Sequence, residues 1–197
     1  MSTLGNNISL LTTYKKEVLQ EWKSILKYWM DFTIDKDNGG FFGSVNNDNI
    51  PNNSAARGLV MYSRILWSFS AAYHYFNDDA YLQTANKAYS FIQSNFADNI
   101  NGGMYWSVDE NGKVLDGKKQ IYALAFCIYG MAEYYKCTKD VNALNTAIDL
   151  FNIIEKYSYD ILNHGYFEAF AFFAEQIGRR NSDVLKNDIR GIGGPDP

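Results

Sequence analysis

Apolar side chains along the chain follow helical spacing and alternate between two kinds of segment. Residues 9–33 are apolar at three- and four-residue steps with charges between them, which predicts a long amphipathic helix. Residues 55–76 and 120–135 are apolar on almost every side and predict buried helices. Residues 80–96 and 141–157 are amphipathic again and predict half-exposed helices.

One short phrase recurs between these helices. Each copy places an aspartate five residues before a glycine that two large apolar residues follow. The copies are Asp35–Phe42, Asp98–Tyr105 and Asp160–Phe167. Their glycines, Gly40, Gly103 and Gly165, recur at a period of about 62 residues, and such self-similarity predicts a repeat architecture. Each repeat would hold a loop, a buried helix and a half-exposed helix.

The loops predict turns and short strands. Gly39–Gly40 forces a turn, residues 41–45 can pair as a short strand, and residues 46–53 are expected to form a loop. Ser54 is expected to cap the first buried helix. Asp109–Gly112 lies between two apolar segments and predicts a β-hairpin.

The alternation predicts an all-α fold of the α/α-toroid class, with an inner and an outer ring of helices and short β-hairpins in the loops. A closed (α/α)6 barrel has six hairpins, and six periods would need on the order of 370 residues. The chain has 197 residues, which predicts about half a barrel. We expect residues 1–178 to form this partial barrel domain, and residues 179–197 to form a divergent, frayed tail rich in charge, glycine and proline.

Composition narrows the function. Aromatic residues make up 16% of the chain and suit surfaces that are apolar on one side and wet on the other, such as sugar clefts and helix interfaces. A net charge of −4 without a basic stripe argues against nucleic-acid binding. The first residues lack a signal sequence and no stretch has the length of a membrane span, so we expect a cytoplasmic protein without a membrane partner.

Cysteine and histidine offer little chemistry. Cys127 and Cys137 lie about 15 Å apart along one predicted helix, too far for a disulfide, and are expected to be reduced. His74 is expected to be exposed or capping at a helix end, and His164 to serve the turn of the third phrase. No Cys and His spacing typical of a metal site occurs, and no cofactor is expected.

Arg64 is the most informative charge, because it lies in the first predicted buried helix. Arg57 and Ser68 are expected to share its helical face. An unpaired guanidinium in a dry core is too costly, so this face should meet either an internal acid or a wet cavity. The sequence leaves both alternatives open.

Other side chains are candidates for contact with a sugar. Tyr122 begins the second buried helix, at the loop end where an inner cavity would open. Trp67, Tyr105 and Trp106 offer stacking faces, although core packing is the commoner role of such aromatics. Glu168 has the chemistry of an acid or base, but no second carboxylate can be paired with it as a hydrolase requires.

Four ordered segments resemble a known family. The segments 56–73, 102–109, 119–126 and 165–170 are similar to those of the cellobiose 2-epimerases, isomerases of the N-acylglucosamine 2-epimerase superfamily. The similarity covers about residues 10–170. It implies the (α/α)6-barrel fold and interconversion of glucose and mannose configuration at C2 of the reducing end of β-1,4-linked disaccharides.

The resemblance also implies roles for particular residues. Epimerisation passes through an enediolate, which requires two proton-transfer groups and a donor at the developing oxyanion. Arg64 matches the family's arginine at the oxyanion, and Tyr122 matches its substrate-contacting tyrosine. The family's two catalytic histidines and its Met-Asn-Thr-His segment have no match after Phe170. We therefore expect the N-terminal half of an epimerase, weakly active or inactive by itself.

Two other functions stay open. One is a non-catalytic carbohydrate-binding or scaffold module that uses the aromatic loops, and the other is a glycoside hydrolase or lyase on a similar six-hairpin toroid. A half-toroid would also expose the inner faces of its buried helices, so self-association through these helices is expected.

Overall fold

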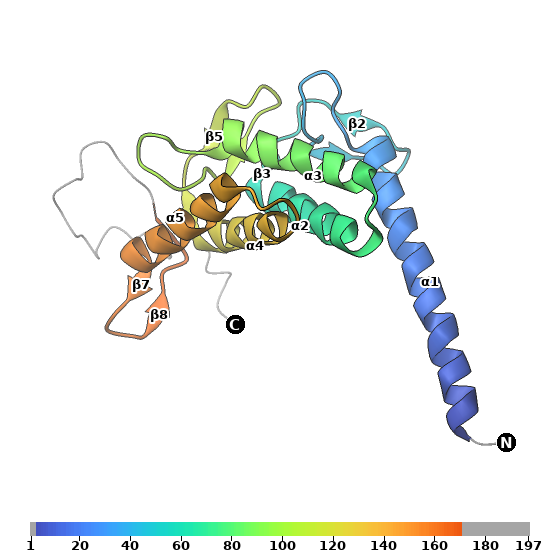
Figure 1. The fold of residues 1–197 in the computed structure, drawn as a ribbon. Helices are drawn as coiled ribbons and strands as arrows, with labels where there is room; N and C mark the ends of the chain where they lie inside the picture. The colour runs from blue at the N-terminus through green and yellow to red at the C-terminus, as the bar shows by residue number, and fades with distance from the viewer. Residues whose placement is uncertain (1–2, 171–197) are drawn as a thin grey trace, which may run out of the picture.

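The computed structural model describes residues 3–170, which form five α-helices; the last four pack in two layers, and the first stands beside them (Figure 1). The helices are α1 (Thr3–Phe32), α2 (Leu59–Phe76), α3 (Asp79–Phe91), α4 (Ile121–Thr138) and α5 (Val141–Tyr157), and one π-helical turn, η1 (Ile92–Phe96), extends α3. The inner helices α2 and α4 lie side by side, with α3 and α5 packed on one side of them. All five predicted helices are confirmed. The last residues of the predicted domain, 171–178, and the predicted tail, 179–197, lie outside the described residues.

A glycine sets the distance between the inner helices. A Cβ atom on Gly130 of α4 would lie 2.7 Å from the carbonyl oxygen of Ser63 on α2. Ser63 is fully buried, and its hydroxyl donates to the carbonyl oxygen of Leu59 in its own helix, at 2.8 Å. The two helices therefore cross in backbone contact, which a larger residue at position 130 would prevent.

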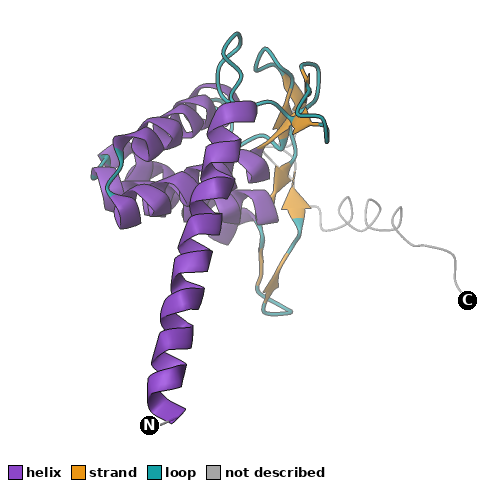
Figure 2. Ribbon diagram, turned by 90° about the vertical axis from the view of Figure 1, so that its right-hand side faces the viewer, coloured by secondary structure: helices purple, strands orange, loops and turns teal. Residues whose placement is uncertain are grey.

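The long helix α1 contacts the rest of the molecule only along part of its length. The Trp22 ring packs against Tyr75 and Phe76 at the end of α2, with centroids 5.4 and 4.9 Å apart. Figure 2 shows the N-terminal half of α1 reaching beyond the other helices. Leu11 and Tyr14 on this half are exposed, so the amphipathic pattern of α1 is only partly satisfied by the described residues.

The first inner helix begins later than the sequence predicts. It starts at Leu59 with Gly58 as its N-cap, and Ser54 is not a cap, because its amide and hydroxyl both donate to Asn52 Oδ1. Residues 57–58 are extended since they pair with a strand of the next loop. Arg57 therefore does not share the helical face of Arg64, contrary to our expectation.

Short antiparallel strands occupy the loops. They are β1 (Ser44–Val45), β2 (Pro51–Asn52), β3 (Arg57–Gly58), β4 (Ser107–Val108), β5 (Val114–Asp116), β6 (Lys119–Gln120), β7 (Tyr159–Asp160), β8 (Gly165–Tyr166) and β9 (Ala169–Phe170). The predicted hairpin around residues 109–112 is confirmed as β4–β5. The expected loop 46–53 instead contains β2, which pairs with β1.

The strands join each repeat to the next. The strand before α2, β3, pairs with β4 of the second loop, and the strand before α4, β6, pairs with β9 of the third loop. The bounds of α2, its C-cap, the N-cap of α3 and the strand pair β3–β4 recur one repeat later in the chain, the strand pair as β6–β9. The predicted repeat is thus confirmed, and equivalent positions can be compared residue by residue.

The first two phrases each hold a buried ion pair at equivalent positions. Arg57 Nη2 lies 2.5 Å from Asp35 Oδ2, and Lys119 Nζ lies 2.8 Å from Asp98 Oδ2. Burial raises the pKa of both aspartates, but hydrogen bonds outweigh it, so the pKa of Asp35 lies below its usual range and that of Asp98 is about 2. Both carboxylates stay ionised. Each ion pair links a loop to the strand that leads into the inner helix.

Candidate functional site

Aromatic side chains and one arginine gather on the exposed face of the two inner helices. The Trp67 and Tyr129 rings stack with centroids 4.9 Å apart and planes 13° apart. The Arg64 guanidinium carbon lies 4.8 Å from the centroid of Phe126. The Phe126 ring also meets Tyr122 and Tyr129 edge to face, with centroids 4.8 and 6.4 Å apart. We call these five residues the inner face.

The repeat explains how the inner face is assembled. Phe126 is the equivalent of Arg64 in the next repeat, and Tyr129 is the equivalent of Trp67. Because α2 and α4 are equivalent helices in direct contact, equivalent side chains meet across the interface. The sequence analysis did not single out Phe126 or Tyr129. Counting one repeat onward from Arg64 and Trp67 leads to these two residues, so the repeat length could have identified them.

Arg64 points to solvent rather than into a dry core. Its side chain is exposed, and within residues 3–170 no carboxylate forms an ion pair with it. The sequence left open an internal acid or a wet cavity for Arg64, but the structure places the side chain on the exposed surface, beside neither within the described residues. The paired arginine is Arg57, which is 1% exposed and also donates to the carbonyl oxygen of Gly39 at 2.8 Å. Among the described residues no carboxylate therefore pairs with the Arg64 donors, and the guanidinium lies over the ring of Phe126.

The loop aromatics lie at the start of the inner helices. The amide of Leu59, the first residue of α2, donates to the carbonyl oxygen of Trp106, and Lys118 Nζ lies 5.2 Å from the Trp106 ring. Tyr105 covers the buried ion pair instead, with its ring centroid 4.1 Å from Lys119 Nζ. Trp106 thus lies beside the start of α2 and packs partly buried against the core, whereas Tyr105 lies over the ion pair of the second loop.

Glu168 lies at the start of α4, opposite Ile121, the residue before Tyr122. Its carbonyl oxygen accepts from the amide of Ile121, and its carboxylate accepts from Gln120 Nε2 at 3.0 Å. The strand pair β6–β9 fixes this position. Glu168 is exposed and its described partner is an amide, so the structure adds no second carboxylate to it within residues 3–170.

The two histidines lie away from the inner face. His74 is exposed in the last turn of α2, ten residues and about 15 Å along the axis from Arg64. His164 adopts a left-handed φ of 54° in the third phrase, so the predicted turn role is confirmed. Both cysteines are free, and the described residues hold no cluster of three His, Cys, Asp or Glu side chains suited to a metal ion.

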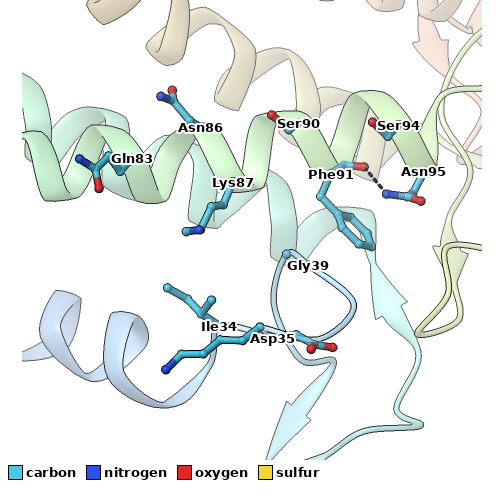
Figure 3. Close-up of a pocket in the computed structure, with 12 residues that line it drawn as sticks. Ile34, Asp35, Gly39, Gln83, Asn86, Lys87, Ser90, Phe91, Ser94 and Asn95 are labelled. Atoms are coloured by element: carbon cyan, nitrogen blue, oxygen red, sulfur yellow. Dashed lines mark hydrogen bonds between the residues drawn. The ribbon is translucent and has the colours of Figure 1, made fainter.

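Two shallow grooves lie on the outside of the molecule, at equivalent places in the repeat. One, of about 690 Å³, runs between the first phrase and α3 and is lined by polar side chains including Gln83, Asn86, Lys87 and Ser90 (Figure 3). The other, of about 480 Å³, runs between the second phrase and α5. Neither contains a residue of the inner face. Among the described helices, none combines the length and the apolar character that a membrane crossing requires.

Several sugar epimerases resemble this chain in sequence and in fold. The chain is 42% identical over 156 residues to the cellobiose 2-epimerase of Bacteroides fragilis, covering 79% of this chain and 40% of that protein. The structure of a sugar epimerase from a ruminal bacterium superposes with a TM-score of 0.74 at 38% identity, over 79% of this chain and 39% of the other. The cellobiose 2-epimerase of Bacillus thermoamylovorans superposes with a TM-score of 0.73 at 35% identity, over 79% and 41%.

These similarities confirm the predicted fold class. The described residues form part of an α/α toroid. The chain spans about two fifths of the length of the curated relatives it matches. The sequence profile of the family described as N-acylglucosamine 2-epimerase (GlcNAc 2-epimerase) matches residues 15–182, most of the chain. The chain therefore belongs to the N-acylglucosamine 2-epimerase family.

Proposed function

We propose that this chain supplies one wall of the sugar cleft of a 2-epimerase that acts at C2 of the reducing-end residue of β-1,4-linked disaccharides such as cellobiose. The observation that carries the proposal is the inner face, where an exposed arginine lies over Phe126, which meets Tyr122 and Tyr129, and where Trp67 stacks on Tyr129. Aromatic rings match the apolar faces of pyranose sugars, and a guanidinium provides several donors to oxygen atoms.

The inner face has the means to stabilise an enediolate. When the sugar ring opens and a base removes the C2 proton, negative charge develops on the carbonyl oxygen. Arg64 needs no proton transfer to donate hydrogen bonds to this oxygen, and Phe126 limits its motion before the reaction. Trp67 and Tyr122 would hold the sugar against the arginine. This acid–base chemistry uses no cofactor, and we expect it in the cytoplasm.

Proton transfer is the part that the inner face does not supply. The reaction needs a group near neutral pKa on each side of C2, and His74 and His164 are the chain's histidines, both placed away from Arg64. We therefore propose that the chain alone is weakly active or inactive. Groups from outside the described residues would complete the acid–base pair.

An assay of the purified chain with cellobiose tests this proposal. Loss of both proton-transfer groups should lower the rate by a factor of at least about 10⁴ relative to the Bacteroides fragilis enzyme. The product with mannose at the reducing end is measured by anion-exchange chromatography, with the relative as positive control. Turnover by this chain that Arg64→Ala abolishes would contradict the proposed inactivity and show that the chain provides its own acid and base.

A carbohydrate-binding module without catalysis is the second candidate, because the inner face has binding chemistry but no proton-transfer pair. If the inner face binds sugar, Trp67→Ala should weaken binding of cellobiose about tenfold, since a stacked ring contributes about 1–2 kcal/mol. Calorimetric titration of the chain with cellobiose measures this change.

Trp106→Ala is the matched control, because Trp106 lies in the second loop beside the start of α2 and is not a residue of the inner face. A small effect of Trp106→Ala beside a large effect of Trp67→Ala supports the inner face as the sugar site. The reverse order would assign binding to the aromatic loops and contradict the proposed cleft. The hydrolase or lyase hypothesis finds no support in the inner face, which carries no carboxylate.

A further inference from the structure

The groove between the first phrase and α3 has a chemistry of its own, different from that of the inner face. Its volume of about 690 Å³ falls in the range of small-molecule sites, about 300–1,000 Å³. The first phrase contributes Lys36 and Gly39 to its lining, and α3 contributes Gln83, Lys87 and Ser90. Figure 3 shows Lys87 extending from α3 toward the first phrase. We call this groove the first groove.

The first groove carries two positive charges that no carboxylate offsets. Lys36 and Lys87 are both exposed, and within residues 3–170 neither forms an ion pair. Among the described residues that line the groove, the one carboxylate is that of Asp35. Its charge is already neutralised by Arg57 in the core. The lining therefore keeps the net charge of the two lysines.

Neutral polar side chains lie beside these lysines. Gln83, Ser90 and Ser94 are exposed on α3 and line the groove, and their side chains make no hydrogen bond with another described residue. Amide and hydroxyl groups both donate and accept hydrogen bonds, as the hydroxyls of a sugar do. The groove thus offers cations to an anionic group and hydrogen-bond partners to hydroxyls of the same ligand.

The groove between the second phrase and α5, which we call the second groove, provides an internal comparison. Asp149 of α5 is the equivalent of Lys87, and Asn99 of the second phrase is the equivalent of Lys36. Lys156 brings a positive charge to the second groove, but the charge of Asp149 offsets it. The repeat therefore produces a groove at both places, whereas the excess positive charge belongs to the first groove.

We propose that the first groove binds a phosphorylated monosaccharide, with its phosphate group between Lys36 and Lys87. The hydroxyls of the sugar bind to Gln83 and to the serines of α3. A phosphate monoester carries a charge of about −1.5 to −2 at pH 7, which matches two lysines. Lysine binds phosphate as a compact point charge, whereas the planar carboxylate of a sugar acid is matched best by arginine. The described lining of the groove includes no arginine, so it favours the phosphate.

The first groove is separate from the inner face. None of the five residues of the inner face lines it. Its ligand also differs in kind, because cellobiose is neutral and a sugar phosphate is an anion. The inference therefore goes beyond the proposed function and does not depend on it. It can be tested by binding, without an epimerase assay.

Calorimetric titration of the full chain with glucose 6-phosphate tests the inference. Lys36→Gln and Lys87→Gln should each weaken binding about tenfold, because each removes a charged hydrogen bond to the phosphate. Inorganic phosphate should bind about tenfold more weakly than glucose 6-phosphate, since it lacks the hydroxyls that reach α3. Added salt should weaken binding of both, because it screens exposed charges.

Lys156→Gln is the matched control, because Lys156 is an exposed lysine of the second groove and the change alters the net charge of the chain by the same amount. This variant should bind glucose 6-phosphate as the unchanged chain does, and circular dichroism should show all variants to be helical. Equal weakening by Lys156→Gln would overturn the inference. So would equal affinity for inorganic phosphate and glucose 6-phosphate, or no binding of glucose 6-phosphate by the helical chain.

Arg64→Ala separates the first groove from the inner face, where Arg64 is another exposed cation. This variant should keep the affinity for glucose 6-phosphate. If Arg64→Ala abolished binding while Lys36→Gln and Lys87→Gln left it unchanged, the phosphate would belong to the inner face and the inference would be wrong. A failure of the proposed function would show instead as cellobiose binding that does not depend on Trp67, and would leave this titration unaffected.

Discussion

Arg57→Met is expected to lower the free energy of unfolding by about 3–5 kcal/mol. The substitution leaves the carboxylate of Asp35 buried, with a side chain that is 0% exposed and without its cation. It also removes the donor to the carbonyl oxygen of Gly39, so the first phrase and the strand before α2 lose their link. Urea denaturation followed by circular dichroism measures the change. The midpoint of thermal unfolding should fall by roughly 6–20 °C for a chain of this length.

Two further variants show whether the buried charge is the cause. Lys27→Met removes the cation of an exposed pair with Asp31, whose lysine is 72% exposed, and should change stability by less than about 0.5 kcal/mol. The double variant Asp35→Asn with Arg57→Met should recover part of the loss, because no unpaired carboxylate remains. An Arg57→Met chain as stable as the Lys27→Met chain would show that the ion pair does not hold the loop.

Gly130→Leu is expected to destabilise the chain by about 3 kcal/mol and to separate the inner helices. Even the first carbon of the new side chain would lie 2.7 Å from the carbonyl oxygen of Ser63, and backbone atoms cannot move aside as a flexible side chain can. The stacking of Trp67 on Tyr129, one residue away, should be lost with it. Thermal unfolding measures the stability, and near-ultraviolet circular dichroism reports the aromatic pair.

Ser68→Leu provides the matched control, because Ser68 occupies the equivalent position of α2 and is half-buried, whereas Gly130 is buried. This change should alter stability by less than about 0.5 kcal/mol. If both leucine variants unfolded alike, close packing at Gly130 would not set the distance between α2 and α4.

The helices and the repeat could be predicted from the sequence because each depends on residues close together in the chain. The 3.6-residue period of apolar side chains located all five helices, and the recurring phrase gave the repeat length. The start of α2 could not be predicted in this way. Residues 57–58 are extended because they pair with Ser107–Val108, about 50 residues away, and no local pattern announces a strand of two residues.

This error also decided which arginine was expected to be buried. With a helix from residue 55, Arg57 and Arg64 would share a face, but the strand turns Arg57 into the core and leaves Arg64 outside. The gathering of Arg64, Trp67 and Tyr122 on the inner helices agrees with the sequence candidates. Their roles in sugar binding stay predictions. The sequence analysis missed Phe126 and Tyr129, because they contact Arg64 and Trp67 only across the interface between α2 and α4.

The strand pairs between successive loops have a consequence for how the chain unfolds. Since β3 pairs with the second loop and β6 with the third, no helical hairpin can open alone without breaking hydrogen bonds in its neighbour. Such nearest-neighbour coupling makes unfolding spread from one repeat to the next rather than stay local. The amides of Leu59 and Ile121, which donate to the following loops, should therefore exchange with solvent at one common rate.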